Sequence, residues 1–255
     1  MKIVKFIASI LVFLGISILM IWAIVKSNDQ TCNQISILIH AAENSKLITE
    51  SDVLHILKQN HIEWEGKTIK EIDLASVNEI LAKENYIKSV DKVHFLSSKL
   101  QIEVTLYDIL LEVQPQNGNK FLISVEKTYL PYSPKVGNDV IIAQGVKACH
   151  FPKKETTMLD DANLDELFAM ASLIHEDSFY RKLFHKLSIN DNQELTLYPS
   201  VGNIPVLFGT TQEAQSKLQL LKHMYKDVLP YVSEDQYAQL DVRFKNRIIA
   251  KKTKT

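Results

Sequence analysis

The chain has 255 residues, of which 46% are hydrophobic and 23% are charged, a composition typical of a folded protein and not of a disordered one. Seven glycines give little support to the glycine-rich loops that cradle phosphate groups. The formal net charge is −1, and it is −4 beyond residue 26, so the charge argues against nucleic-acid binding. The length allows one large or two small domains.

An uncharged run at residues 6–25 is the longest apolar segment of the chain. As a helix it would span about 30 Å, the thickness of a bilayer's hydrocarbon core. A cleaved signal peptide is the alternative, but its apolar run is normally shorter, and the residues after Lys26 offer no convincing cleavage site. We therefore expect one uncleaved transmembrane helix. Lys2 and Lys5 before it favour a cytoplasmic tail at residues 1–5, with the bulk of the chain extracytoplasmic.

A compact β-α-α-β-β unit is predicted at residues 34–107, after a polar linker at residues 26–33. An apolar strand at residues 34–42 is followed by a helix that Thr49 caps. A second helix is predicted at residues 73–84, where apolar residues recur at helical spacing. A hairpin with its turn at Ser97 and Ser98 then ends the unit, and its second strand alternates apolar and polar residues up to residue 107.

Residues 108–251 are predicted to form a second, β-rich domain with helices packed on its sheet, followed by a tail at residues 252–255. Five short strands are expected at residues 109–113, 121–125, 140–143, 194–198 and 205–208, and two more at 237–244 and 247–251. Asn163 is expected to cap a helix, and residues 178–187 to continue helically. A capping box formed by Thr210 and Glu213 predicts another helix to about residue 229. The predicted fold class is therefore α+β.

No set of residues predicts a catalytic, cofactor or metal site. The histidine pairs His55/His61 and His175/His185 do not have the spacing of zinc ligands. The acidic pair Asp165-Glu166 suits a helix start, and no substrate cleft accompanies it. A disulfide between Cys32 and Cys149 is not expected, because one lies next to the anchor and the other within the β-rich domain.

The last predicted hairpin is the candidate partner-binding site. Its second strand lies near the end of the chain, where it can form a sheet edge. Lysines after it would protect an ordinary edge from aggregation. The functional alternative is strand addition, in which a partner takes up the unpaired backbone groups. The residues expected to carry it are Arg243, Phe244, Ile248, Ile249 and Ala250.

The order of these segments, and several short motifs, resemble the FtsQ/DivIB family of bacterial cell-division proteins. The first unit resembles a POTRA domain. The motifs lie after the second POTRA helix, in its last strand and through the β-rich domain: Asn85-Tyr86-Ile87, Leu100-Gln101-Ile102, residues 121–131, Glu194-Leu195-Thr196-Leu197, Phe208-Gly209, Lys217-Leu218 and Leu240-Asp241-Val242-Arg243-Phe244. Residues 121–131 depart from the family pattern, with Ser124 where aspartate is common and Lys127 where glycine is common.

The resemblance implies a non-enzymatic scaffold without a cofactor. It implies a bitopic protein of the bacterial inner membrane, located at the division septum. Its partners would be FtsB/DivIC-like and FtsL-like coiled-coil proteins, with the last strands of the β domain capturing a segment of FtsB. Two alternatives stay open, a membrane-anchored extracytoplasmic cell-wall enzyme and an outer-membrane or protein-assembly factor with POTRA units.

Overall fold

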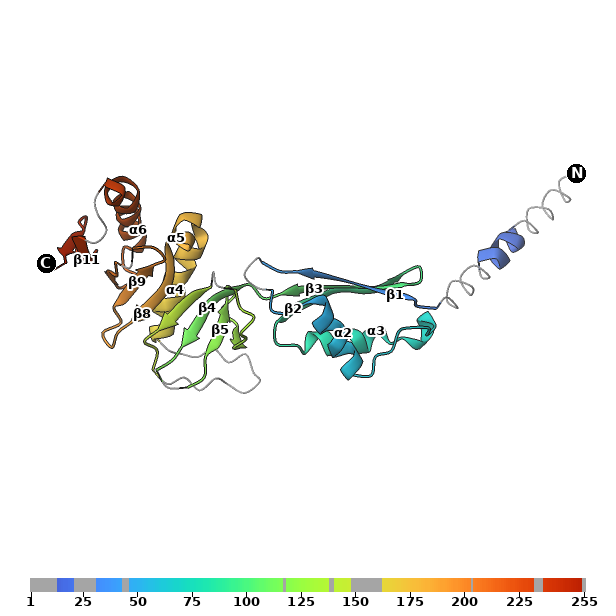
Figure 1. Cartoon of the computed structure of the whole chain (residues 1–255). Helices are drawn as coiled ribbons and strands as arrows, with labels where there is room; N and C mark the ends of the chain where they lie inside the picture. Colours follow the sequence, from blue (N-terminus) through green and yellow to red (C-terminus); the bar gives the residue numbers. More distant parts are fainter. Residues whose placement is uncertain are drawn as a thin grey trace, which may run out of the picture. The chain divides into compact units, whose positions relative to one another are not determined.

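A computed structural model describes residues 13–20, 31–42, 46–116, 118–137, 140–147, 162–202, 204–231 and 236–253 (Figure 1). Contacts divide the chain into two compact units. The first ends at His40 and resumes over Ile48–Leu106, and the second comprises Ala41–Leu47 and Tyr107–Thr255. Each unit is described by itself.

The expected transmembrane segment is described only over residues 13–20, which are helical. The rest of residues 6–25 lies outside the described residues. Within the described ranges, no helix combines the length and the apolar character that a membrane crossing requires.

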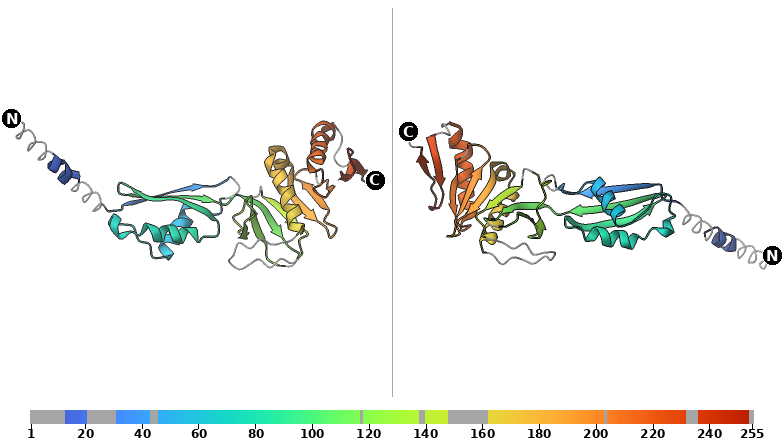
Figure 2. Two further views of the ribbon diagram at one scale, coloured as in Figure 1. Left: turned by 180° about the vertical axis from the view of Figure 1, so that it is seen from behind. Right: turned by 60° about the horizontal axis from the view of Figure 1, so that its bottom comes forward.

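The first unit is a three-stranded sheet with two helices on one face (Figures 1 and 2). Its elements are β1 (Gln34–His40), α2 (Glu50–Gln59), η1 (Ile69–Glu71), α3 (Leu74–Ala82), β2 (Ile87–Leu96) and β3 (Lys99–Leu106). The strand order is β1-β3-β2, with β1 parallel and β2 antiparallel to β3. The predicted β-α-α-β-β order is thus confirmed.

Local sequence signals fix the ends of these elements. The Thr49 hydroxyl accepts the Asp52 N–H and the Asp52 carboxylate accepts the Thr49 N–H, which closes a capping box at the start of α2. At the start of α3, the Asp73 carboxylate accepts the Ala75 N–H and so caps the helix. Alternate residues of β3 are fully buried against the helices, while those between them are half-exposed on the open face. The amphipathic strand and helices therefore form one small core.

The second unit is built on a nine-stranded sheet in the order β12-β11-β10-β9-β8-β7-β4-β5-β6. The strands are β4 (Ile109–Gln114), β5 (Phe121–Ser124), β6 (Tyr129–Pro131), β7 (Ile141–Gln144), β8 (Phe184–Ile189), β9 (Leu195–Pro199), β10 (Val206–Gly209), β11 (Tyr237–Asp241) and β12 (Ile249–Lys252). The helical segments are α4 (Ala162–Glu176), α5 (Ser178–Leu183), α6 (Ala214–His223), the π-helix η2 (Met224–Val228) and the 3₁₀-helix η3 (Leu229–Tyr231). The pairs β4–β7, β7–β8 and β10–β11 are parallel.

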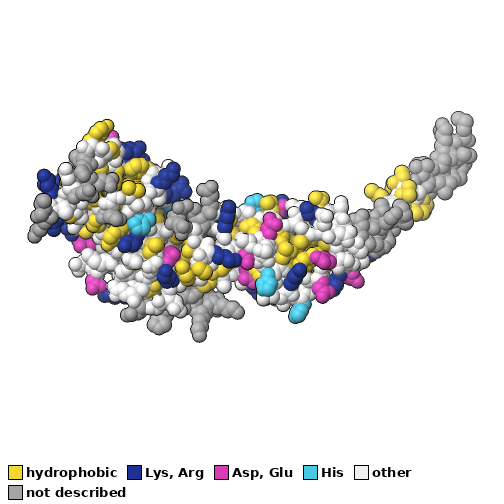
Figure 3. All heavy atoms as spheres, in the orientation of Figure 1, with side chains coloured by type: hydrophobic (Ala, Val, Ile, Leu, Met, Phe, Trp, Pro, Cys, Tyr) yellow, Lys and Arg dark blue, Asp and Glu magenta, His cyan; other side chains and the backbone are white. Residues whose placement is uncertain are grey.

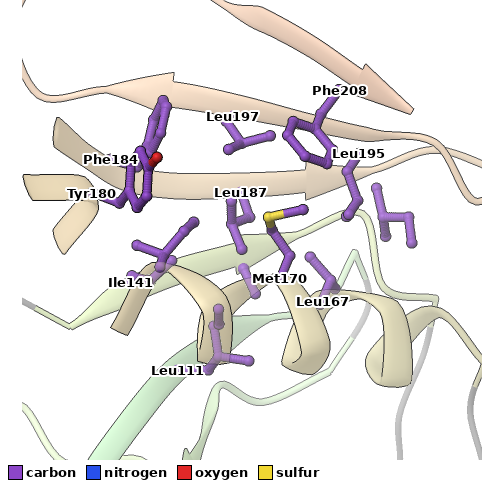
Figure 4. Packing of buried hydrophobic residues seen from close by; sticks show 14 of the residues in the cluster. Leu111, Ile141, Leu167, Met170, Tyr180, Phe184, Leu187, Leu195, Leu197 and Phe208 are labelled. Carbon is purple, nitrogen blue, oxygen red and sulfur yellow. The ribbon is translucent and has the colours of Figure 1, made fainter. Parts of the chain in front are cut away.

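The core of this unit lies between α4 and the sheet. Leu167 and Met170 of α4 point at buried side chains of the central strands, including Leu187 and Leu197 (Figure 4). Phe208 of β10 continues this layer toward the C-terminal strands. A continuous apolar layer therefore supports the sheet up to β11, where Leu240 is fully buried.

Three predicted local structures in this unit are wrong. Residues 178–187 are not one helix, because α5 ends at Leu183 and β8 follows; a register irregularity after Phe184 hides the strand's alternation. Asn163 lies within α4, which already includes Ala162, and is not its cap. The capping box of Thr210 and Glu213 does not form, because Glu213 adopts a left-handed conformation (φ 55°) and makes no side-chain cap. In its place, the Thr211 N–H donates to the Glu166 carboxylate of α4.

Candidate partner-binding edge

The last strand of the chain, β12, is the terminal strand of the nine-stranded sheet and pairs antiparallel with β11. Both strands are shorter than predicted. The Asp241 carboxylate accepts the Arg243 N–H two residues ahead, and this local turn ends β11. Val242 still donates to Leu207 O, so the chain remains beside β10 for one more residue. The turn to β12 includes Asn246 in a left-handed conformation (φ 57°), which asparagine tolerates well.

Arg243 is held by two carboxylates at the base of this hairpin. Its Nε and Nη2 donate to the two oxygens of Asp241 at 3.0 and 2.8 Å, a bidentate pair. Its Nη1 donates to Glu194 Oε1 at 3.2 Å, which ties the hairpin to β9. The Arg243 hydrogen bonds lower the pKa of Asp241, and those from Asn190 and then Arg243 lower the pKa of Glu194. We call Arg243, Asp241 and Glu194 the arginine clamp.

The five predicted site residues all lie on this hairpin or its turn, in two different environments. Ile248 and Ala250 pack partly against the core. Phe244 and Ile249 are 45% and 46% exposed, so they are available to a partner. Arg243 uses three of its five N–H groups in the clamp while its side chain stays 37% exposed. Arg243 therefore mainly stabilises the hairpin.

The backbone of β12 has a defined outward side. The Thr253 N–H donates to Gln236 O, so the backbone of Thr253 faces β11. Backbone groups alternate along a strand, and the register irregularity lies in β11, between Tyr237 and Gln239. The N–H and C=O groups of Ala250 and Lys252 therefore point away from β11, toward the open edge.

A cavity of about 340 Å³ lies beside the hairpin turn, between it and the start of α6. Its lining includes Gly209, Lys217, Arg243 and Phe244. Lys217 Nζ donates to Phe208 O and Thr210 O and lies 4.9 Å from the Phe208 ring centre, and burial lowers its pKa. Because its ammonium group donates to two backbone carbonyls of the cavity wall, Lys217 stabilises that wall.

Two known protein families match parts of the chain. Residues 110–251, more than half of it, match the family model described as "FtsQ/DivIB, C-terminal related". The chain belongs to the FtsQ/DivIB family. Residues 30–105 match the POTRA-like domain. Among curated proteins, none matches the chain. FtsQ/DivIB domains are those of a cell-division scaffold, and the family is generally non-enzymatic.

Several scattered FtsQ/DivIB motifs meet around the clamp. Glu194 accepts a hydrogen bond from Arg243, and Gly209 leaves space for it, since a Cβ there would lie 3.1 Å from Arg243 Cγ. Sequence reasoning singled out Arg243 but missed Asp241, Glu194 and Gly209 as its surroundings. The motifs Glu194-Leu195, Phe208-Gly209 and Lys217-Leu218 were visible in the sequence, but their meeting point was not. Lys127, where the family commonly has glycine, adopts φ 63°, a conformation that glycine takes without strain.

Other candidate sites can be placed as well. Among the residues that the structure describes, no three histidine, cysteine or acidic side chains come together as metal ligands. Cys32 is a buried free thiol, and its Sγ donates to Gln34 O at 3.5 Å. Cys149 lies outside the described residues.

Proposed function

We propose that this protein is a non-enzymatic scaffold of the bacterial division machinery that captures an extended segment of an FtsB/DivIC-like protein on β12. The observation that carries the proposal is the terminal position of β12 in the sheet, with Ala250 and Lys252 directing backbone groups outward. Such an edge can accept one further strand. The exposed side chains of Ile249 on β12 and Phe244 in the preceding turn would add apolar contacts.

Charge indicates what kind of segment this edge would prefer. Residues 236–253 carry five basic side chains and one acidic one, Asp241. Arg243 and Asp241 are engaged with each other in the clamp, which leaves four basic side chains outside it. Figure 3 shows lysine and arginine side chains at the C-terminal end of the second unit. We therefore propose that the captured strand, or its flanks, carries acidic side chains, which would speed association and orient the strand.

The proposed setting is the inner membrane at the division septum. The uncharged run at residues 6–25 would serve as the single anchor, with residues 1–5 cytoplasmic and both units extracytoplasmic. An FtsL-like coiled-coil protein would join the complex through the FtsB/DivIC-like partner. Membership in the FtsQ/DivIB family favours this scaffold over a cell-wall enzyme or an outer-membrane assembly factor.

The test is binding of the full-length chain, held in lipid nanodiscs, to the full-length FtsB/DivIC-like protein of the same organism. Ala250→Pro removes an outward N–H without removing a bond to β11. Loss of one hydrogen bond, together with an orphaned partner carbonyl, should weaken binding roughly ten- to thousandfold. Ala250→Ser keeps the N–H at the same position and should bind close to wild type.

Two further measurements make the result decisive. Thermal melting of both variants checks that the second unit remains folded. Lys252→Glu reverses an exposed charge at the edge and should weaken binding, most clearly at low salt. A folded Ala250→Pro variant with wild-type affinity would place the interface elsewhere in the chain.

A further inference from the structure

The chain enters the first unit at the end of its sheet where the β2–β3 hairpin turns. The Asn33 N–H donates to Ser98 O in this turn, and Gln34 pairs with Lys99 at the start of β3. Figures 1 and 2 show the hairpin turn and the start of β1 at the same end of the unit. The hairpin turn therefore lies at the end of the unit that is closest along the chain to the uncharged run at residues 6–25.

The loop before η1 meets the chain at the same place. Thr31 forms an antiparallel bridge with Thr68 in this loop. The Cys32 N–H donates to the carbonyl of the residue before Thr68, so the chain is paired with the loop over two successive residues. We call residues 67–69 and 96–99 together the entry end of the first unit.

An exposed leucine lies in the hairpin turn of the entry end. Leu96 is 61% exposed, the largest fraction among the large hydrophobic side chains described between residues 31 and 106. It pairs with Lys99 across a two-residue turn, in which Ser97 adopts a left-handed conformation (φ 56°). In a membrane interface, such a leucine can enter the boundary of the acyl chains while the neighbouring ammonium reaches the headgroups.

Lysines and glutamates are mixed around the entry end. Glu63 pairs with Lys67 at 3.2 Å, and the Glu71 carboxylate accepts the N–H and the hydroxyl of Thr68. Glu65 is exposed in the same loop. This mixture gives no strong attraction to anionic lipids, so a contact with a bilayer would depend on the apolar side chain of the hairpin turn.

The proposed anchor would keep the entry end close to the bilayer. Val25 is the last residue of the uncharged run, and Thr31 follows six residues later. Six residues span at most about 22 Å, and the headgroup layer adds roughly 6 Å to each side of the hydrocarbon core. The entry end would therefore start within about 16 Å of the headgroup surface. Tethering at this range gives a high effective concentration, so a weak apolar contact is enough for docking.

We propose that the entry end docks on the extracytoplasmic surface of the membrane, with Leu96 inserted at the boundary between headgroups and acyl chains. Lys99 would lie at the level of the lipid phosphates. This inference rests on the proposed anchor at residues 6–25, and not on strand capture by β12. The far end of β2, at Ile87, would then lie up to about 30 Å further from the bilayer.

The test is photocrosslinking to lipid in the full-length chain, held in nanodiscs of phosphatidylcholine. The photoreactive residue p-benzoylphenylalanine replaces one residue at a time, and mass spectrometry measures the yield of lipid adducts. Ser98, in the hairpin turn, is the test position. Ile18 lies in the proposed anchor, and Asn85 lies just beyond the far end of β2. We expect high yields at Ile18 and Ser98, and a yield at Asn85 roughly tenfold lower than at Ser98.

Variants at Leu96 separate docking from proximity alone, with p-benzoylphenylalanine kept at Ser98. Leu96→Asp places a carboxylate in the turn and should lower the Ser98 yield roughly tenfold, because a charge leaves water only at a high cost. Leu96→Met keeps an apolar side chain and should retain the yield. Thermal melting checks that both variants stay folded, which we expect because Leu96 is exposed.

The outcomes distinguish this inference from the proposed anchor. A low yield at Ile18 would reject the anchor and the docking together. A high yield at Ile18 with equal yields at Ser98 and Asn85 would overturn the docking alone. An unchanged Ser98 yield in the folded Leu96→Asp variant would also overturn it, since the hairpin turn would then lie near lipid without inserting Leu96.

Discussion

Gly209 and Arg243 lie close together at the base of the β11–β12 hairpin. Gly209 has φ +76°, and a Cβ at this position would lie 3.1 Å from Arg243 Cγ. Gly209→Ala should therefore destabilise the second unit by about 1–2 kcal/mol through its left-handed backbone alone, and by more through this contact. We expect a smaller loss when the same substitution is made in an Arg243→Ala background. The measurement is a double-mutant cycle of urea unfolding, and equal losses in both backgrounds would show that the contact has no effect.

The clamp also predicts how the stability of the second unit depends on pH. Arg243 lowers the pKa of Asp241, so the folded state favours the ionised carboxylate. A carboxyl group with a lowered folded pKa stabilises the protein above its unfolded pKa, about 4, and loses this effect as the pH falls through the folded pKa. The melting temperature of wild type should exceed that of Arg243→Ala near pH 7, and the difference should shrink below about pH 4. A difference that stays constant down to pH 2 would contradict this linkage.

At the scale of elements, the connection from β10 to α6 is held by the Lys217 side chain, and not by the local capping box that the sequence predicts. Lys217 Nζ donates to the buried Phe208 carbonyl at 3.2 Å and to Thr210 O at 2.9 Å. Lys217→Met keeps the apolar stem but removes the donor, and should destabilise the unit by about 1–2 kcal/mol. Lys245→Met is the control, because Lys245 is 74% exposed and its ion pair with Glu213 is 3.4 Å long. Urea unfolding of both variants tests the difference, and equal losses would assign no structural role to the Lys217 ammonium.

Elements with a local signature could be predicted from the sequence. The alternation in β3 and the cap at Thr49 are examples, because each depends on neighbours within a few residues. β8 was missed because its register breaks after Phe184, and the period of two that identifies a strand is interrupted there.

The candidate site was predicted only in part for the same reason. The hairpin and its exposed residues follow from the local pattern, whereas the bond from Arg243 to Glu194 joins residues 49 positions apart. Such a contact has no local signature, and the parallel pairing of β10 with β11 that brings the segments together has none either.

At the scale of the whole molecule, the chain has two separate cores. The large apolar cluster of the second unit draws all of its buried residues from position 110 onward. The first unit has its own buried set on β1, β3, α2 and α3, including Leu57 and Leu81, both fully buried. Each unit therefore has its own hydrophobic core, and each has its own sheet.

Separate cores predict separate unfolding transitions. Leu81→Ala in the first unit and Leu187→Ala in the second remove equal side chains from fully buried positions. Each should cost about 2–5 kcal/mol, because the lost burial is joined by the cost of a cavity. Calorimetry of the full-length chain in nanodiscs should show one transition shifted by each variant, and hydrogen exchange assigns each transition to its unit. If either variant shifted both transitions together, the two cores would be energetically coupled.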